Sequence, residues 1–285
     1  MVEPKVSIEC LFGISNAINQ PKNKTNQMKV HIIGGGNLGV SIALGIAKFS
    51  QNNQVTVTRR NTGSILHLEK LGITVSADNT HEIQEADVII LTIKPYQVDT
   101  VLAEILPVIS NKIIASAVSG LAIEVLQEKT KFQNHAVRIM PNIAAQFGES
   151  ATCISFNEKD KVEGQNVVSL FNDLGTALVI DEKLMDAATV LGACGTAYAL
   201  RYIRASMQAG IEIGFDSQTA LAIAAQTVKG AAQMLVEEKV HPEQLIDRVT
   251  TPQGCTIVGL NEMEHNGFSS SLIKGIKTSL KQIKG

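Results

Sequence analysis

Residues 30–40 read Val30-His31-Ile32-Ile33-Gly34-Gly35-Gly36-Asn37-Leu38-Gly39-Val40: a short apolar segment leads into a cluster of glycines, and a run of small and apolar residues follows. This order predicts a strand, a phosphate-sized turn and a helix. Gly34, Gly36 and Gly39 fill a Gly-x-Gly-x-x-Gly fingerprint, which allows the tight turn, the approach of a pyrophosphate and close helix packing. We therefore expect a dinucleotide whose phosphates face the N–H groups at the helix start.

Length and composition fit a globular protein with a full core. At 285 residues the chain is long enough for one large domain or two ordinary ones, and we expect two. The formal net charge of -2 gives no reason to expect nucleic acid or an anionic membrane as a partner. No apolar run is long enough to span a bilayer.

The cysteines and histidines predict no further site. Cys10, Cys153, Cys194 and Cys255 are scattered without Cys-x-x-Cys spacing, so we expect no metal, no disulfide framework and a cytoplasmic location. Cys194 and Cys255 are interpreted as replacements for similarly small residues rather than as a redox pair. None of the histidines has a partner at metal-ligand or catalytic spacing.

The first 27 residues differ from the segment that follows them. Residues 16–27 are rich in Asn, Lys and Gln, and the apolar patch at residues 8–14 is short and broken by Glu9 and Gly13. A secretory signal would need a basic start and a longer apolar region. We predict a flexible N-terminal extension over residues 1–27, with the compact fold starting at Met28.

Two arginines follow the second predicted strand, residues 54–58. In nucleotide-binding folds an acidic residue about 20 positions beyond the fingerprint binds the ribose of NAD, whereas arginine suits the 2′-phosphate of NADP. The sequence here is Arg59-Arg60-Asn61-Thr62, without a carboxylate. An ordinary solvated turn is the alternative, but the position favours a 2′-phosphate clamp made by guanidinium groups. We therefore predict NADPH in preference to NADH.

Strand and helix patterns alternate through the first part of the chain. The segment Asp87-Val88-Ile89-Ile90-Leu91-Thr92-Ile93 is typical of a strand buried on both faces of a parallel sheet. It ends at Lys94-Pro95, and the crevice of an open α/β sheet lies beyond such strand ends. We predict a doubly wound, Rossmann-type domain over residues 28–181. Further expected strands, with their turns, are 73–75, 112–120, 136–142, 151–156 and 177–181, and expected helices are 64–71, 98–106 and 161–174.

The pattern changes after residue 181 to long stretches rich in Ala, Leu and Ile, without strand signals. We predict an all-α domain over residues 182–285. Residues 220–232 are small and apolar on almost every face, so a partner subunit is expected to help bury this helix. The expected helices are 184–191, 197–213, 217–238, 242–249, 256–264 and 269–283, with Gly214, Gly254 and Gly267 at breaks.

Short motifs in a fixed order carry a family resemblance. In the first half they are residues 34–39, Asp78-Asn79, Ile93-Lys94-Pro95, Ser119-Gly120 and Arg138-Ile139-Met140-Pro141-Asn142. In the second half they are Leu184-Met185-Asp186-Ala187, Gly195-Thr196-Ala197-Tyr198, His241-Pro242 and Val249-Thr250-Thr251-Pro252-Gln253-Gly254-Cys255-Thr256-Ile257. From Met28 to its C-terminus, the chain resembles the pyrroline-5-carboxylate reductase family.

The resemblance implies an oxidoreductase that uses NAD(P)H to reduce the C=N bond of 1-pyrroline-5-carboxylate, giving L-proline in the last step of proline biosynthesis. It also implies a helical domain similar to that of 6-phosphogluconate dehydrogenase. Through this domain, members of the family form an interlocked homodimer, which often assembles into a larger ring. The cofactor would contact residues that follow the strands of the sheet. By the match these are Gly34, Gly36, Asn37, Leu38, Gly39, Arg59, Arg60, Asn79, Ile93, Lys94, Pro95 and Ser119.

The resemblance places the substrate carboxylate on backbone N–H groups at a helix start, which suits an anion. The residues are Thr251, Pro252, Gln253, Gly254, Cys255 and Thr256, with Asn142 nearby. Thr256 matches a threonine whose hydroxyl lies near the ring nitrogen, where it would orient or help protonate that nitrogen. From the residues alone, a capping threonine without a chemical role is an equal alternative. Hydride addition to an imine needs placement rather than a strong base.

Two loops depart from the family pattern. The usual Ser-Gly-Ser-Gly-Pro-Ala-Tyr reads Gly192-Ala193-Cys194-Gly195-Thr196-Ala197-Tyr198, and Pro-Gly-Gly-Thr-Thr reads Pro252-Gln253-Gly254-Cys255-Thr256. The loss of a glycine at Gln253 matters if that residue needs a positive φ. The departures leave two alternatives open: a related reductase of another small carboxylated imine or hydroxyacid, and a catalytically silent subunit that binds NADPH.

Overall fold

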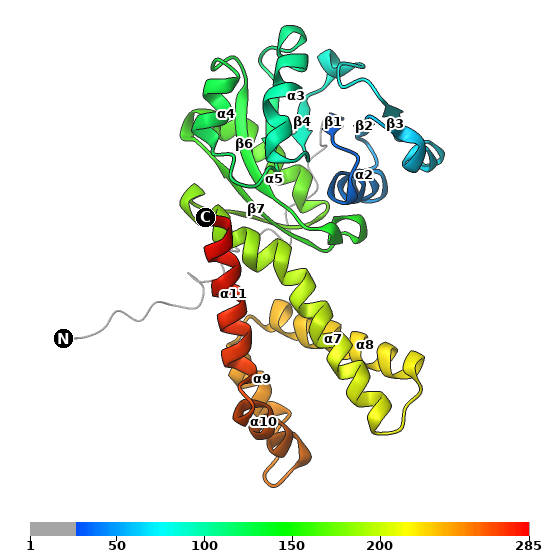
Figure 1. Cartoon of the computed structure of the whole chain (residues 1–285), viewed down its shortest axis with the longest axis vertical. Helices are drawn as coiled ribbons and strands as arrows, with labels where there is room; N and C mark the ends of the chain where they lie inside the picture. Colours follow the sequence, from blue (N-terminus) through cyan, green and yellow to red (C-terminus); the bar gives the residue numbers. More distant parts are fainter. Residues whose placement is uncertain (1–26, 285) are drawn as a thin grey trace, which may run out of the picture. The chain divides into compact units, whose positions relative to one another are not determined.

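The computed structural model describes residues 27–284. They form two compact units, of which one holds residues 27–196 and 279–284 and the other holds residues 197–278. The domain limits expected from the sequence, 1–27, 28–181 and 182–285, stay predictions, and residues 1–26 of the expected extension lie outside the described part. In Figure 1 the strands of the first unit run from blue to green, and the helices of the second run from yellow to red.

The first unit contains one eight-stranded sheet (Figure 1). Its strands are β1 (Lys29–Ile33), β2 (Gln54–Thr58), β3 (Thr74–Ser76), β4 (Val88–Leu91), β5 (Ile113–Ser116), β6 (His135–Met140), β7 (Ser150–Phe156) and β8 (Gly175–Val179). The spatial order is β3-β2-β1-β4-β5-β6-β7-β8, and every neighbouring pair is parallel except β6 and β7. The winding direction reverses between β1 and β4, which is where such sheets bind ligands.

Helices cover both faces of this sheet. Helices α2 (Asn37–Phe49) and α5 (Lys161–Asn172) pack on one face, where Phe171 is among the fully buried side chains. Helices α3 (Val98–Ile105) and α4 (Ile123–Lys129) pack on the other face. The doubly wound, Rossmann-type sheet predicted from the sequence is therefore confirmed.

The two central strands β4 and β5 are almost entirely apolar, as parallel strands covered on both faces need to be. Every residue of β4 and β5 is buried, because helices on both faces exclude water from parallel strands. Strand β4 is shorter than the apolar run at residues 87–93, since it ends at Leu91. The hydroxyl of Thr92 donates to the carbonyl oxygen of Gly34 at 2.7 Å, so the residue after the strand serves the glycine turn.

The helix expected over residues 64–71 is wrong. This segment forms two short 3₁₀ turns, η2 (Thr62–Ser64) and η3 (Leu66–Leu71). Ile65 separates them with φ −122° and ψ 0°, and the side chain of Asn61 accepts a backbone N–H and starts the first turn early. A segment this short makes few α-helical hydrogen bonds for the cost of nucleation.

The helix expected over residues 184–191 also differs. A 3₁₀ turn, η9 (Glu182–Leu184), leads into the single turn α6 (Met185–Ala188), which continues as a π-helix, Thr189–Cys194. A π-helical stretch inserts residues into the usual i→i+4 pattern and is often found at functional sites. Hydrophobic periodicity alone does not distinguish such an insertion from an ordinary helix.

Five helices with short connections follow within residues 195–284, and an all-α second half is confirmed. They are α7 (Gly195–Glu212), α8 (Ser217–Glu238), α9 (Pro242–Arg248), α10 (Cys255–His265) and α11 (Phe268–Lys284). No helix within residues 27–284 combines the length and the apolar character needed to cross a membrane.

The second unit leaves much of its apolar surface uncovered. Among its residues, the buried hydrophobic ones are Ala220, Ala224 and Leu245 alone. Large apolar side chains stay exposed on its helices, including Leu200 at 57% and Val258 at 66%. Apolar surface of this kind marks a site of protein association. The expectation that α8 needs a partner for its burial fits these exposures.

Candidate active site

The residues predicted to bind the cofactor all follow strands of the sheet. Strands β1 to β5 are parallel, so their carboxyl ends lie along one edge, and the structure gathers the predicted residues there. The glycine turn follows β1, Arg59 and Arg60 follow β2, Asn79 follows β3, Ile93, Lys94 and Pro95 follow β4, and Ser119 follows β5. Of the residues after β4 and β5, Ile93 is half-buried, whereas Lys94, Pro95 and Ser119 are exposed.

The three fingerprint glycines are needed for different reasons. Gly34 has φ +114°, and a Cβ there would lie 2.8 Å from the carbonyl oxygen of Thr92. A Cβ on Gly39 would lie 2.2 Å from the carbonyl oxygen of Gly34. A Cβ on Gly36 would meet nothing within 4 Å. The fold itself therefore requires Gly34 and Gly39, whereas Gly36 leaves space for a ligand to approach the backbone.

Helix α2 starts directly behind this space. Its N-cap residue is Gly36, so no side chain caps the helix, and its first turn contains no acidic residue. The first-turn N–H groups, those of Asn37, Leu38 and Gly39, have no acceptor within the helix and lie at its positive end. The diphosphate of a dinucleotide supplies the acceptors and the negative charge that such an end lacks, so the residues present fit that group.

Arg59 lies beside the glycine turn. Its Nη1 donates to the carbonyl oxygen of Gly35 at 2.8 Å. The N–H groups of Gly34 and Gly35 both donate to the carbonyl oxygen of Thr58, at 3.1 and 2.9 Å, which ties the turn to the end of β2. Arg59 and Arg60 are exposed. A guanidinium has five N–H donors, so Arg59 can hold Gly35 and still donate to a phosphate.

Asn79 is held by side chains from other elements. The hydroxyl of Thr58 donates to its Oδ1 at 2.6 Å, and its Nδ2 donates to Glu104 Oε2 at 2.9 Å. The residue is half-buried beyond the end of β3. These two contacts join β2 and α3 through one amide, and they were not predicted from the sequence.

Asn142 follows β6 and has its amide engaged on both sides. Its Oδ1 accepts the N–H of Ala144 at 3.0 Å, and its Nδ2 donates to the carbonyl oxygen of Gly192 at 3.3 Å. Gly192 belongs to the π-helix Thr189–Cys194. Asn142 therefore fastens the π-helix to the edge of the sheet.

A buried arginine near this edge, paired with two half-buried carboxylates, was missed by sequence reasoning. Arg138 on β6 is 6% exposed, its Nη2 donates to Asp186 Oδ1 at 2.9 Å, and its Nη1 lies 3.6 Å from Glu182 Oε1. A buried charge is costly unless it is paired, so an arginine inside an apolar strand was the available signal. The sequence gives no information on which acidic residue supplies the partner.

The turn before α10, in the second unit, has the same design as the glycine turn. Gly254 is the N-cap, no side chain caps the helix, and its first turn has no acidic residue. Gln253 has φ +60°, so the position where the family pattern has glycine does adopt the left-handed conformation. Thr251 lies close to Gly254: a Cβ built on Gly254 would come to 2.4 Å from Thr251 Oγ1. Thr256 is exposed in the first turn of α10.

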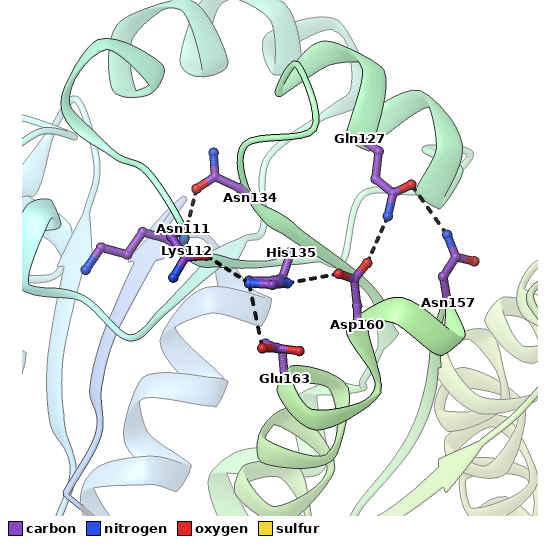
Figure 2. A network of polar contacts seen from close by, with 8 residues as sticks. All are labelled: Asn111, Lys112, Gln127, Asn134, His135, Asn157, Asp160 and Glu163. Atoms are coloured by element: carbon purple, nitrogen blue, oxygen red, sulfur yellow. Dashed lines mark hydrogen bonds and ion pairs between the residues drawn. The ribbon is translucent and has the colours of Figure 1, made fainter.

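A separate polar network surrounds His135 at the start of β6, which is the opposite edge of the sheet (Figure 2). His135 Nδ1 lies 2.9 Å from Asp160 Oδ1, and Nε2 lies 3.2 Å from Asn111 Oδ1 and 3.7 Å from Glu163 Oε1. Gln127 donates to Asp160 Oδ2 at 2.9 Å. Spacing along the sequence gave no sign of these partners of His135, because the fold joins distant segments. The network links α4 and β6 to the start of α5.

Two family models match the chain. The model described as NADP oxidoreductase, coenzyme F420-dependent, matches residues 29–120. The model described as pyrroline-5-carboxylate reductase dimerisation matches residues 182–285 and indicates self-association. With the parallel sheet and the glycine turn, the first match defines an NADP-binding oxidoreductase.

Individual proteins narrow this class. Pyrroline-5-carboxylate reductase 1 of Dictyostelium discoideum is 43% identical over 88% of this chain, which spans 48% of that relative's length. Pyrroline-5-carboxylate reductase 2 of the same organism is 41% identical over 89% of this chain and 91% of the relative. The crystal structure of the Plasmodium falciparum pyrroline carboxylate reductase with NADP bound has a TM-score of 0.79 and 27% identity, covering 90% of this chain and 97% of that one. The chain belongs to the pyrroline-5-carboxylate reductase family.

Proposed function

We propose that this protein reduces the C=N bond of 1-pyrroline-5-carboxylate to give L-proline and prefers NADPH to NADH. The observation that carries the proposal is a pair of uncapped helix N-termini, those of α2 and α10, each behind a glycine and each without an acidic residue in its first turn. The first suits the diphosphate of the cofactor, and the second suits the carboxylate of the substrate. The names of the two Dictyostelium discoideum relatives support this choice of substrate.

The sheet edge is the proposed cofactor site. The N–H groups of Asn37, Leu38 and Gly39 would hold the diphosphate, and the open space at Gly36 lets it approach. Arg59 and Arg60 would hold the 2′-phosphate, which NADH lacks. When bound, NADPH supplies the hydride that the reaction needs. The remaining proposed contacts are Gly34, Asn79, Ile93, Lys94, Pro95 and Ser119.

The start of α10 is the proposed substrate site. Its free N–H groups would bind the carboxylate, and the turn residues Thr251, Pro252, Gln253, Gly254 and Cys255 would shape the site, with Asn142 as a further contact. Thr256 is exposed in the same turn, and its hydroxyl would hold the ring nitrogen while that nitrogen gains its proton. The nitrogen becomes a basic amine during the reaction, so the protein needs to orient it rather than supply a strong base.

We also propose that the self-association takes the form of an interlocked dimer, assembled further into a ring. The exposed apolar side chains of the second unit and the matching dimerisation model support the dimer. Light scattering on the purified protein tests the assembly, and a particle with the mass of one chain would contradict it. A cytoplasmic location stays a prediction, to be tested by cell fractionation.

The activity is tested directly with purified protein. Mixed with NADPH and 1-pyrroline-5-carboxylate, it should oxidise the cofactor and release an equal amount of L-proline. If the protein binds NADPH but makes no proline, the proposed substrate is refuted. Turnover of another imine would then favour a related reductase, and no turnover would favour a catalytically silent NADPH-binding subunit. Faster turnover with NADH would refute the arginine clamp alone.

A further inference from the structure

Arg138 is a buried charge that the proposed mechanism does not use. It lies on β6 in register with Ser116, the last residue of β5, and is 6% exposed. Alternation along the strand puts it on the same face as Ala136, which belongs to the buried cluster under α3 and α4. A buried guanidinium needs a partner for its charge. Two carboxylates supply it, and neither comes from the strands next to β6.

Glu182 connects Arg138 to the start of α4. Its Oε1 lies 3.6 Å from Arg138 Nη1 and accepts the backbone N–H of Ile123 at 2.7 Å. Ile123 is the first residue of α4, and the N-cap residue before it, Ala122, has no side-chain oxygen to take such an N–H. The turn that contains Ser119 lies directly before this helix start. Glu182 therefore fixes the place where that turn ends.

Asp186 connects Arg138 to the π-helix. Its Oδ1 accepts Arg138 Nη2 at 2.9 Å, and it belongs to α6, which leads directly into the π-helix Thr189–Cys194. Within the π-helix, the carbonyl oxygen of Gly192 accepts Asn142 Nδ2 at 3.3 Å. Arg138 on β6 and Asn142 beyond the end of β6 thus hold one helical segment at two places.

The shape of the guanidinium lets one side chain hold both connections. Its planar fork presents Nη1 and Nη2 to separate acceptors, which a single ammonium group cannot do in a fixed geometry. Arg138 Nε is buried and has no partner among the described atoms, so the arrangement serves the two carboxylates rather than every donor of the arginine. Glu182 and Asp186 are half-buried, so each keeps contact with water if Arg138 is replaced.

We propose that Arg138 is a positioning residue for the hydride transfer from cofactor to imine carbon. Through Glu182 it sets the turn at Ser119, and through Asp186 and the π-helix it sets the amide of Asn142. The inference rests on the proposed function, which makes Ser119 a cofactor contact and Asn142 a substrate contact. Arg138 itself touches neither ligand. Hydride transfer depends on the relative placement of the two rings, so displacement of either connection lowers its rate.

Arg138→Met and His135→Met form a matched pair on one strand. Each removes a side chain of β6 that lies against two carboxylates, which for His135 are Asp160 and Glu163 at the opposite edge of the sheet (Figure 2). Both variants should lower the melting temperature. Arg138→Met should also lower kcat at least about tenfold, since a misplacement of about 1 Å can cost about 100-fold in rate. Its dissociation constant for 2′-phospho-ADP-ribose, which lacks the nicotinamide, should stay unchanged, and His135→Met should keep both kcat and KM.

Each connection also has its own pair of variants. Asp186→Ala removes the acceptor of Arg138, whereas Asp186→Asn keeps an oxygen in its place. Asp186→Ala should lower kcat about fivefold, the effect of one hydrogen bond, and Asp186→Asn should retain most of the rate. Glu182→Ala should lower kcat by freeing the start of α4. Glu182→Gln should restore it, because its amide oxygen can still accept the N–H of Ile123.

Hydrogen exchange gives a readout that needs no catalysis. In Arg138→Met the backbone amides of residues 189–194 should exchange at least about tenfold faster, while those of residues 34–39 keep their wild-type rates. Unchanged kcat or unchanged exchange in Arg138→Met, or an equal loss of kcat in His135→Met, would overturn the positioning role. If Arg138→Met does not fold, an Asp186→Ala variant as active as Asp186→Asn would overturn it. A wild-type protein that makes no proline would overturn the proposed function instead.

Discussion

The turn before α2 and the turn before α10 are built alike and supported differently. Each ends at a glycine N-cap and leads into a helix whose first N–H groups are free for an anion. The first turn belongs to a sheet with fully buried strands, and its left-handed residue is a glycine, Gly34. The second belongs to a unit with few buried apolar residues, and its left-handed residue is Gln253.

The two turns differ in the contacts that hold them in place. The turn before α2 is fixed by contacts to β2 and to Thr92, all within the first unit. In the turn before α10, the N–H of Gly254 donates to the carbonyl oxygen of Thr251 within the turn itself, and Gln253 strains the backbone. We therefore expect Gly39 at the first turn to affect folding and cofactor binding together, and Thr256 at the second to affect turnover.

The largest effect is expected at Gly39. Gly39→Ala would bring a Cβ to 2.2 Å from the carbonyl oxygen of Gly34, so it should lower the free energy of unfolding by about 3 kcal/mol and abolish NADPH binding. Gly36→Ala has free space in the unliganded protein, so it should cost at most about 1 kcal/mol of stability. Its NADPH affinity should still fall at least about tenfold, because the methyl group stands where the diphosphate binds. Thermal unfolding measures the stability and calorimetry measures the affinity. Normal NADPH binding by Gly36→Ala would refute the proposal that the diphosphate binds at the glycine turn.

Thr256→Val comes next, because it removes the hydroxyl while keeping the shape of the side chain. We expect kcat to fall about 100-fold with the affinity for NADPH unchanged, since the hydroxyl serves the substrate nitrogen. Thr256→Ser restores a hydroxyl and should recover most of the rate in steady-state assays. A variant Thr256→Val with full activity would leave Thr256 as a structural residue at the helix start.

The two arginines should differ from each other. Arg60→Ala should weaken NADPH binding about tenfold and leave NADH binding unchanged, because it removes a charged contact to the 2′-phosphate alone. Arg59→Ala also removes the bond to Gly35, so it should weaken the binding of both cofactors. Titrating each variant with both cofactors measures the pattern. Equal losses for NADPH and NADH in Arg60→Ala would contradict the clamp.

The smallest effect is expected at Gln253. Because this residue has φ +60°, Gln253→Val should lower the free energy of unfolding by about 1 to 2 kcal/mol, as a β-branched residue fits the left-handed conformation poorly. Gln253→Gly removes that strain but frees the unfolded chain, so its stability should stay within about 1 kcal/mol of the wild type. Denaturant unfolding compares the two variants. Equal stabilities of Gln253→Val and Gln253→Gly would contradict the prediction, because they would mean that the turn changes its conformation to remove the strain.

The sequence predicted the features that follow from local pattern. The apolar run at β4 indicated a buried parallel strand, and the fingerprint glycines indicated the turn, since each rests on residues close together in the chain. The order of strands and helices then led to the sheet edge where the predicted cofactor residues meet. The sequence marked Gln253 as a position where a positive φ would matter, and the structure shows that the residue has one.

Features that depend on distant partners could not be predicted. The ion pair between Arg138 and Asp186, for example, joins segments that are far apart in the sequence. The first part of the π-helix, residues 189–191, was predicted as the end of an ordinary helix, because an inserted residue leaves the apolar spacing nearly unchanged. Side-chain partners of this kind are decided by the assembled fold.

The central claim is that two uncapped helix starts divide the work, one holding the cofactor and the other the substrate. A crystal structure of the protein with NADP⁺ and L-proline tests it most directly. The account predicts the diphosphate on the N–H groups of Asn37, Leu38 and Gly39, and the proline carboxylate on the first N–H groups of α10, with the Thr256 hydroxyl at hydrogen-bond distance from the proline nitrogen. A carboxylate bound by side chains away from α10, or a diphosphate away from Gly36, would contradict it.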